Sequence, residues 1–284
     1  MDLFARIEAT AETLRETFSQ IPKTAVVLGS GLGGLADALS DATRLETAAL
    51  PHWPNSSVKG HQSRIIVGKI AGAPLLCLQG RVHVYEGISR EAILIPIRAL
   101  KRAGVERLIL TNAAGSTDPA MPTGSIMAIR DYINFSGFNP LIGPNDERFG
   151  PRFFDVSEAY NRELLKLQQQ AASAVGEPLY EGSYMMFSGP SFETPAEIRM
   201  AQILGARAIG MSTVPETLAA RHCGLEVAAF STITNMAAGL VDGHKLSHQE
   251  TLTEGGKAAK RLIEIMAQFV GLIQGQADET QGVV

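Results

Sequence analysis

The sequence has little of what disulfide-linked, membrane-spanning or nucleic-acid-binding proteins need. Its 284 residues include two cysteines, Cys77 and Cys223, and neither belongs to a Cys-x-x-Cys pair, so we expect reduced core thiols. The formal net charge of −4 does not favour non-specific nucleic-acid binding, and any anion site must be local. No apolar run is long enough to span a bilayer, and the N-terminus has no apolar signal region. These absences predict a cytoplasmic protein without a membrane segment.

Several catalytic motifs are missing as well. The sequence has no His-Glu-x-x-His, no paired Cys/His spacing and no acidic triplet of the kind that would indicate a metal. Gly-x-Ser-x-Gly does not occur, so the nucleophile turn of an α/β-hydrolase is unsupported. We therefore expect neither a metal nor a cofactor.

Apolar runs and turn signals predict one α/β domain. Ala71-Gly72-Ala73 separates two short apolar runs, which indicates a hairpin and so a mixed sheet. Capping boxes at Thr194–Glu197 and Ser247–Glu250 should each open a helix. Without repeats or linkers, residues 1–284 should form a single three-layer α/β sandwich, frayed at 275–284. The expected strands are 24–28, 65–70, 74–79, 107–115, 125–134, 181–189, 206–211 and 225–235, and the other expected helices are 3–20, 89–103, 157–175 and 215–224.

A glycine-rich turn, Gly-x-Gly-x-x-Gly at 29–34, follows the first expected strand. A dinucleotide site would need a parallel second strand next, but TRLETAALPHWP contains no clean strand, and the following elements form a hairpin. We therefore disfavour NAD binding. A turn whose amides face an anion remains open, and Ser30 would add a hydroxyl donor.

The stretch GRVHVYEG, residues 80–87, carries four reactive side chains directly after a buried run. On an extended backbone Arg81, His83 and Tyr85 would point to one side and Glu86 to the other. Three polar groups on one side favour a binding site over a solvated edge. A second candidate is the long punctuated loop at 135–156, because a loop of that length inside a domain is usually functional.

Polar and small residues gather where the expected strands end. In an open α/β sheet, ligands bind at the carboxyl ends of strands. The pattern therefore predicts one composite pocket with an anion corner, an apolar middle and a Glu/Asn polar end. Its expected members are Ser30, Arg81, His83, Ala113, Glu193, Met211, Ser212 and Asn235.

These strings also resemble a known family. GSGLGGLAD, GHQSRIIVG, QGRVHVYEG, LTNAAGS, GPNDERFG, GPSFETPAEIR, GMSTVPETLAARHCGL and STITN occur in the order seen in trimeric purine nucleoside phosphorylases, from about residue 24 to 236. The resemblance implies a phosphorylase/hydrolase-like fold with a partly barrel-like sheet flanked by helices. It also implies reversible phosphorolysis of inosine and guanosine or their deoxy forms, a homotrimer, a role in purine salvage, and phosphate as co-substrate.

The resemblance further assigns roles residue by residue. Tyr85 and Met211 would contact ribose, together with His248, which aligns across a one-residue gap. Phe153 would reach into a neighbouring subunit's pocket. His83, Glu86, Glu193 and Asn235 would be the catalytic residues. Phosphate would be bound by Ser30, His61, Arg81, His83, Ala113 and Ser212, and the base by Phe192, Glu193 and Asn235.

The sequence departs from the family pattern in two places. It has NAAGS where many members have NAAGG, and residues 236–247 do not follow the common pattern, so that His244 has no clear counterpart. Two alternatives remain. A methylthioadenosine phosphorylase would be expected to carry Asp near Asn235 and to lack Glu193, and a non-catalytic purine-binding module would not need Ser30, Arg81 and His83 together.

Overall fold

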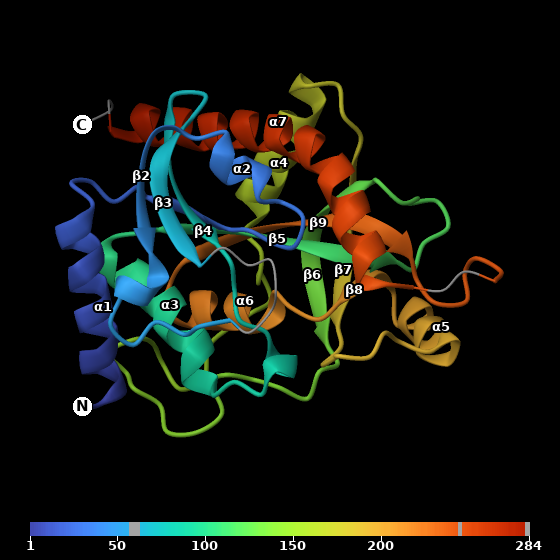
Figure 1. The fold of residues 1–284 in the computed structure, drawn as a ribbon, viewed down its shortest axis with the longest axis horizontal. Helices are drawn as coiled ribbons and strands as arrows, with labels where there is room; N and C mark the ends of the chain where they lie inside the picture. The colour runs from blue at the N-terminus through green and yellow to red at the C-terminus, as the bar shows by residue number, and fades with distance from the viewer. Residues whose placement is uncertain (57–62, 244–245, 282–284) are drawn as a thin grey trace.

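A mixed β-sheet runs through the whole molecule (Figure 1). The structure is a computed structural model, and it describes residues 1–56, 63–243 and 246–281. Within these residues the sheet has nine strands, and all but β2 contain apolar runs of the sequence. They are β1 (Thr24–Val27), β2 (Ser40–Glu46), β3 (Arg64–Ile70), β4 (Ala73–Gln79), β5 (Arg107–Ser116), β6 (Ile126–Asn134), β7 (Leu179–Met186), β8 (Ala206–Gly210) and β9 (Glu226–Met236).

The sheet has an open part and a closed part that share β5. The strand order is β2-β3-β4-β1-β5-β8-β7-β6-β9, and β9 also pairs with β5, which closes the last five strands into a ring. Strand β5 is parallel to β1 on one side and to β9 on the other, whereas β3 and β4 form the expected antiparallel hairpin. The carboxyl ends of β1, β5 and β9 therefore lie together at one edge.

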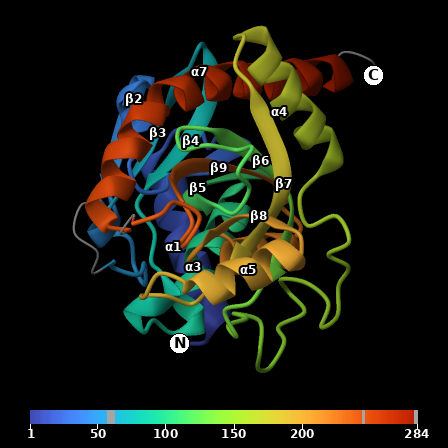
Figure 2. The ribbon, with the colours of Figure 1, turned by 90° about the vertical axis from the view of Figure 1, so that its right-hand side faces the viewer.

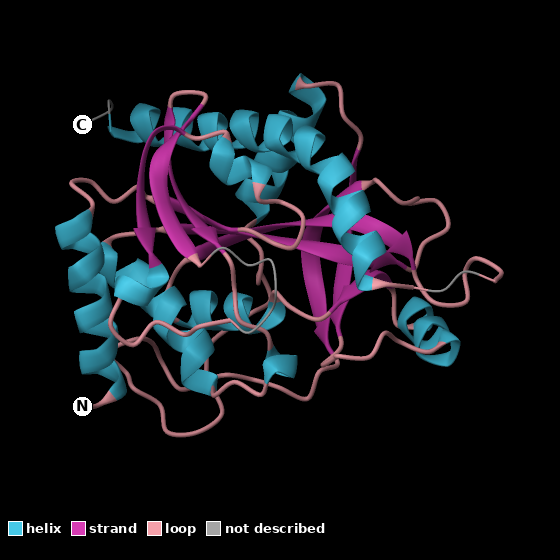
Figure 3. Cartoon of the chain, in the orientation of Figure 1, coloured by secondary structure: helices cyan, strands magenta, loops and turns pink. Residues whose placement is uncertain are grey.

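Helices cover both faces of the sheet and bury two apolar cores (Figures 1 and 3). Helices α1 (Leu3–Thr17), α3 (Arg90–Ala103) and α6 (Val214–His222) pack on one face. Helices α2 (Gly34–Asp37), α4 (Arg162–Ala174) and α7 (His248–Gln281) pack on the other. Helix α5 (Pro195–Ile203) lies beside β8 at the ring (Figure 2), and two short 3₁₀ turns, η1 (Thr47–Ala49) and η2 (Val84–Glu86), complete the set.

This architecture confirms the expected α/β sandwich with a mixed, partly barrel-like sheet. Strand β2 was not predicted, because it is an edge strand whose side chains are mostly exposed and so lacks apolar alternation. It pairs antiparallel with β3, and β1 lies between β4 and β5, so the arrangement of a dinucleotide-binding unit is not formed.

Several element boundaries also differ from expectation. Helix α4 begins at Arg162 rather than 157, because the Asn161 side chain accepts from two backbone N–H groups and caps it there. The Thr194 capping box is confirmed, with bonds in both directions to Glu197. Helix α7 begins directly after Ser247 and extends to Gln281. No helix in the described part of the chain combines the length and apolar character needed to cross a bilayer.

Candidate active site

One cavity of about 330 Å³ lies where β1, β5, β8 and β9 end. Its wall brings together all eight residues expected from the strand ends. Among its lining residues are five of the six expected to bind an anion: Ser30, Arg81, His83, Ala113 and Ser212. The sixth, His61, lies outside the described residues. Residues separated by up to 182 positions in the sequence (Ser30 and Ser212) thus share one corner.

The glycine-rich turn after β1 packs directly on β5. A Cβ on Gly29 would lie 2.7 Å from the Asn112 Cα and 2.8 Å from the Thr111 carbonyl oxygen, too close for any side chain. The Gly29 N–H donates to the Thr111 hydroxyl at 2.9 Å. The first glycine of the motif is therefore needed for close backbone packing, which places Ser30 at the cavity wall.

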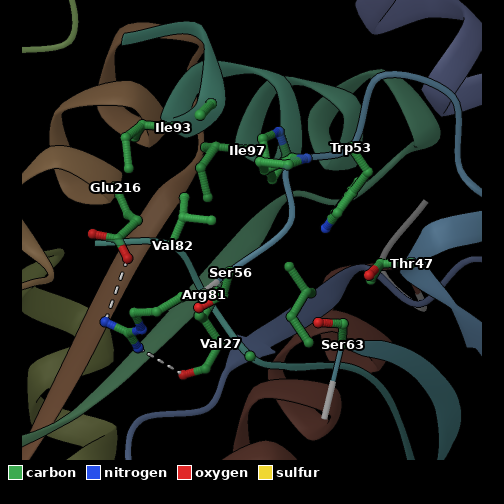
Figure 4. A pocket seen from close by; sticks show the side chains of 15 residues that line it. Val27, Thr47, Trp53, Ser56, Ser63, Arg81, Val82, Ile93, Ile97 and Glu216 are labelled. Carbon is green, nitrogen blue, oxygen red and sulfur yellow. Dashed lines mark hydrogen bonds and ion pairs between the residues drawn. The ribbon is translucent and has the colours of Figure 1, made fainter. Parts of the chain in front are cut away.

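Arg81 is held in the anion corner by acceptors from separate elements. Its Nη2 donates to the carbonyl oxygens of Thr111 and of Val27, the latter at 3.4 Å. Its Nη1 donates to the Thr213 hydroxyl at 3.4 Å and lies 3.4 Å from Glu216 Oε1 (Figure 4). The side chain is only 4% exposed, so its charge is almost fully desolvated. Such a charge in a partly closed pocket attracts anions strongly.

His83 is oriented by Glu86 through a tight local turn. The sequence predicted that the backbone is extended through Tyr85, but residues 84–86 form the turn η2. Tyr85 still lines the cavity, although the alternation of side chains along a strand is not what places it there. Glu86 Oε1 accepts from the His83 backbone N–H at 2.6 Å and lies 3.3 Å from His83 Nδ1. The Tyr85 ring stacks on the His83 ring, with 4.8 Å between centroids. Glu86 therefore positions the His83 ring, and it does not line the cavity itself.

The backbone is strained beside Ser212. Thr213 has φ 77° and ψ −48°, and the Val214 N–H donates to the Ser212 carbonyl at 2.9 Å, which defines a γ-turn with positive φ. This turn is rare and costly for a β-branched residue. The Thr213 hydroxyl accepts from Arg81 and, at 2.8 Å, from Asn112 Nδ2. Thr213 was not predicted as a site residue, because nothing in a sequence pattern marks a γ-turn.

The opposite end of the cavity is polar and lies on the closed part of the sheet. Glu193 is 7% exposed, and among the described residues its Oε1 has no hydrogen-bond partner. Burial raises the pKa of this carboxyl group, and the charge of Glu197 raises it further. The Asn235 amide is fixed on both sides: Oδ1 accepts from the Thr234 hydroxyl at 3.1 Å, and Nδ2 donates to the Met236 carbonyl at 3.1 Å. One N–H of Asn235 remains for a ligand.

Other expected residues fall into three groups. Phe192, Met211 and Tyr85 line the cavity. His248 is the first residue of α7, but its side chain and residue His244 lie outside the described set; Thr251, one turn further along α7, lines the cavity and was not predicted. Phe153 does not line this chain's cavity, and its side chain is 88% exposed.

The loop that carries Phe153 is anchored to α6. His222 Nε2 lies 3.2 Å from Asn145 Oδ1, and His222 Nδ1 lies 3.3 Å from Arg98 Nη2. Because Arg98 can only donate, Nδ1 is the acceptor and the proton is on Nε2. Burial lowers the pKa of His222, and the charge of Arg98 lowers it further, in agreement with a neutral ring. The long punctuated loop is therefore pinned at Asn145, eight residues before Phe153.

The cavity combines donors for an anion at one end with a carboxylate acceptor and an amide donor at the other. In the part of the chain that the structure describes, no group of three or more His, Cys, Asp or Glu side chains is placed to hold a metal ion. The cavity can therefore hold an anion beside a small molecule that both donates and accepts hydrogen bonds. Comparison with known proteins is more specific. Residues 23–270 match the family model described as the phosphorylase superfamily, and the chain belongs to that family.

Relatives from bacteria and mammals agree with this membership. The chain is 46% identical to purine nucleoside phosphorylase 1 of Geobacillus stearothermophilus over 89% of this chain and 92% of that protein. It is 46% identical to the purine nucleoside phosphorylase of Rattus norvegicus over 94% and 93% of the two chains.

Solved structures give the same result. The Schistosoma mansoni purine nucleoside phosphorylase in complex with adenosine superposes with a TM-score of 0.89 at 35% identity, covering 94% of this chain and 96% of that one. A Schistosoma purine nucleoside phosphorylase in complex with hypoxanthine gives the same values.

Proposed function

We propose that this protein is a purine nucleoside phosphorylase, a pentosyltransferase that cleaves the N-glycosidic bond of 6-oxopurine ribonucleosides and deoxyribonucleosides with inorganic phosphate. The products are the free base and α-(deoxy)ribose 1-phosphate. One observation carries the proposal: a single cavity joins a desolvated arginine and two serines at one end to Glu193 and Asn235 at the other.

The anion corner binds and orients the nucleophile. Arg81, His83, the hydroxyl groups of Ser30 and Ser212 and the Ala113 N–H hold phosphate below C1′ of the ribose, with His61 as a further ligand. The phosphate oxygen forms a bond to C1′ from the face opposite the base, so the sugar product has inverted configuration. The bound anion also stabilises the positive charge that develops on the ribose as the glycosidic bond breaks.

The base end receives the electron pair of the broken bond. The departing purine gathers negative charge on N7 and O6, where the free N–H of Asn235 donates. Glu193, when ionised, accepts from the N1–H of a 6-oxopurine. Phe192 packs on the base, and Tyr85, Met211 and His248 contact the ribose. Preorganised donors of this kind act where charge develops, which is how they lower the barrier.

The proposal also covers the assembly of the protein, its location and its biological role. An exposed Phe153 on an anchored loop supports a homotrimer in which this ring covers a neighbour's cavity. A role in purine salvage follows from the family resemblance, and location in the cytoplasm was expected from the sequence itself; both remain predictions.

Incubation with inosine and inorganic phosphate tests the proposal. We expect hypoxanthine and ribose 1-phosphate to form in equal amounts, and no hypoxanthine without phosphate or arsenate. Purine binding without phosphate-dependent cleavage would instead indicate a binding module. Cleavage of methylthioadenosine in preference to inosine would indicate the other phosphorylase subfamily.

A further inference from the structure

Glu216 is a buried carboxylate beside the anion corner with no local partner to explain it. It is the third residue of α6, a position from which Glu commonly bonds back to the start of its own helix. Here the start of α6 has no side-chain cap, and the carboxylate faces Arg81 instead, with Oε1 3.4 Å from Nη1 (Figure 4). The Glu216 side chain is 7% exposed.

Arg81 does not depend on Glu216 for its position. Two backbone carbonyls, of Val27 and Thr111, accept from Nη2, and the Thr213 hydroxyl accepts from Nη1. These three acceptors are neutral. What Glu216 adds beyond them is a negative charge.

The surroundings of the pair make that charge important. Arg81 and Glu216 border a second, small cavity of about 40 Å³, and Glu216 does not line the substrate cavity. Figure 4 shows that its wall is mostly apolar, with Val82, Ile93 and Ile97 facing the pair. Water therefore screens the two charges little, and each strongly affects any third charge nearby.

We propose that Glu216 is the counter-ion of Arg81 and that it sets the affinity for the substrate anion, which on the proposed function is phosphate. In the anion-free enzyme the carboxylate balances the buried guanidinium. When phosphate enters the substrate cavity, the guanidinium is shared between two anions that repel each other. Glu216 thereby weakens phosphate binding.

Substitution Glu216→Gln tests this, because the amide keeps the shape and an acceptor oxygen but removes the charge. We expect the dissociation constant for inorganic phosphate, measured by isothermal titration on the assembled protein at fixed pH, to fall roughly threefold to tenfold. The increase in Tm caused by phosphate should be larger than in the wild type, since phosphate then supplies the only anion for Arg81. Glu216→Asp, which keeps the charge, should bind phosphate within about twofold of the wild type.

Glu226→Gln is the matched control. Glu226 is also paired with an arginine, at 3.0 Å from Arg107 Nε, but it lies at the start of β9, away from the cavity, so its loss should leave phosphate affinity unchanged. Unchanged or weaker phosphate binding in Glu216→Gln would overturn the inference. If Glu216→Gln does not fold alone, phosphate present during purification should rescue it, and failure of this rescue would also overturn it. Wild-type phosphorolysis of inosine tests the proposed function separately.

Discussion

Asn235 and Glu193 present opposite hydrogen-bonding characters to the cavity, and each can be tested alone. Asn235→Asp replaces a donor by a carboxylate that, when ionised, can only accept. Inosine places O6 there, so its kcat/KM should fall heavily, whereas the 6-amino group of adenosine can donate to the new acceptor. We expect the inosine-to-adenosine ratio of kcat/KM to fall about tenfold or more, or about 1.4 kcal/mol of discrimination. A constant ratio would show that Asn235 does not read the 6-position.

Glu193 should make substrate choice depend on pH. Its pKa is raised above 4.5 by burial and by Glu197, so the carboxyl group takes up a proton at a higher pH than a solvated one. Ionised Glu193 accepts from N1–H of inosine; the protonated form can donate to the unprotonated N1 of adenosine. The inosine-to-adenosine ratio of kcat/KM should therefore fall as pH falls through this raised pKa.

The matched variant is Glu193→Gln, which has no titrating group, so the acid-side change in its ratio should disappear. The titration of phosphate and of the anion corner affects both substrates equally, so it cancels in the ratio of their kcat/KM values. An equal pH dependence in the wild type and in Glu193→Gln would exclude Glu193 as its source.

How far the sequence predicted this site depended on where each residue lies. Residues at strand ends, such as Ser30, Ser212 and Asn235, could be placed together because strand ends of one sheet meet at a common edge. Thr213 and Glu216 could not, since their roles arise from a γ-turn and from the approach of α6 to Arg81. Both are tertiary features without a sequence signal.

At the scale of elements, the junction between the punctuated loop and α6 is packed without spare room. A Cβ on Gly150 would overlap the His222 carbonyl oxygen, so Gly150→Ala must push the loop away from the helix. The shift should also break the contact between His222 and Asn145. We expect a loss of roughly 2–3 kcal/mol in the free energy of unfolding, measured by denaturant titration.

Gly271→Ala provides the comparison for this junction. Gly271 lies within α7, and no atom outside the helix backbone lies within 4 Å of the place that a Cβ would take, so alanine there should be neutral or stabilising. Equal stability of the two variants would mean that the loop is not held against α6.

The same scale shows why some elements were predicted and others were not. Buried strands such as β5 and β9 each contain a short apolar run, LIL and VAAF, and their bounds were expected to within one residue. Strand β2 has no apolar run, since most of its side chains are exposed. It is held extended by its pairing with β3. The turn η2 replaced an expected extended segment because Glu86 bonds back to His83.

At the scale of the whole molecule, a substitution of Phe153 tests whether the protein functions as an isolated chain or as an assembly. If its exposed ring covers a neighbour's cavity, Phe153→Ala should raise the nucleoside KM about fivefold or more without lowering Tm. Ile203→Ala removes a side chain of similar exposure, 85%, from α5 and should leave the nucleoside KM unchanged. A fully active monomer, shown by light scattering at assay concentration, would exclude the assembly.

The division of the sheet at β5 has a consequence for how such enzymes can diversify. The loops after β1 and β4 in the open part carry Ser30 and Arg81, whereas the ring strands and their loops carry Glu193, Met211 and Asn235. On the proposed function, most of the nucleophile site lies on the open part and the base site lies on the ring, but Ser212 of the anion corner follows the ring strand β8. Mutations in the ring that keep Ser212 should therefore alter which heterocycle departs while the nucleophile stays the same. The architecture is in this sense modular, and a chimera that exchanges only ring segments should inherit its base preference from one parent and its choice of nucleophile from the other.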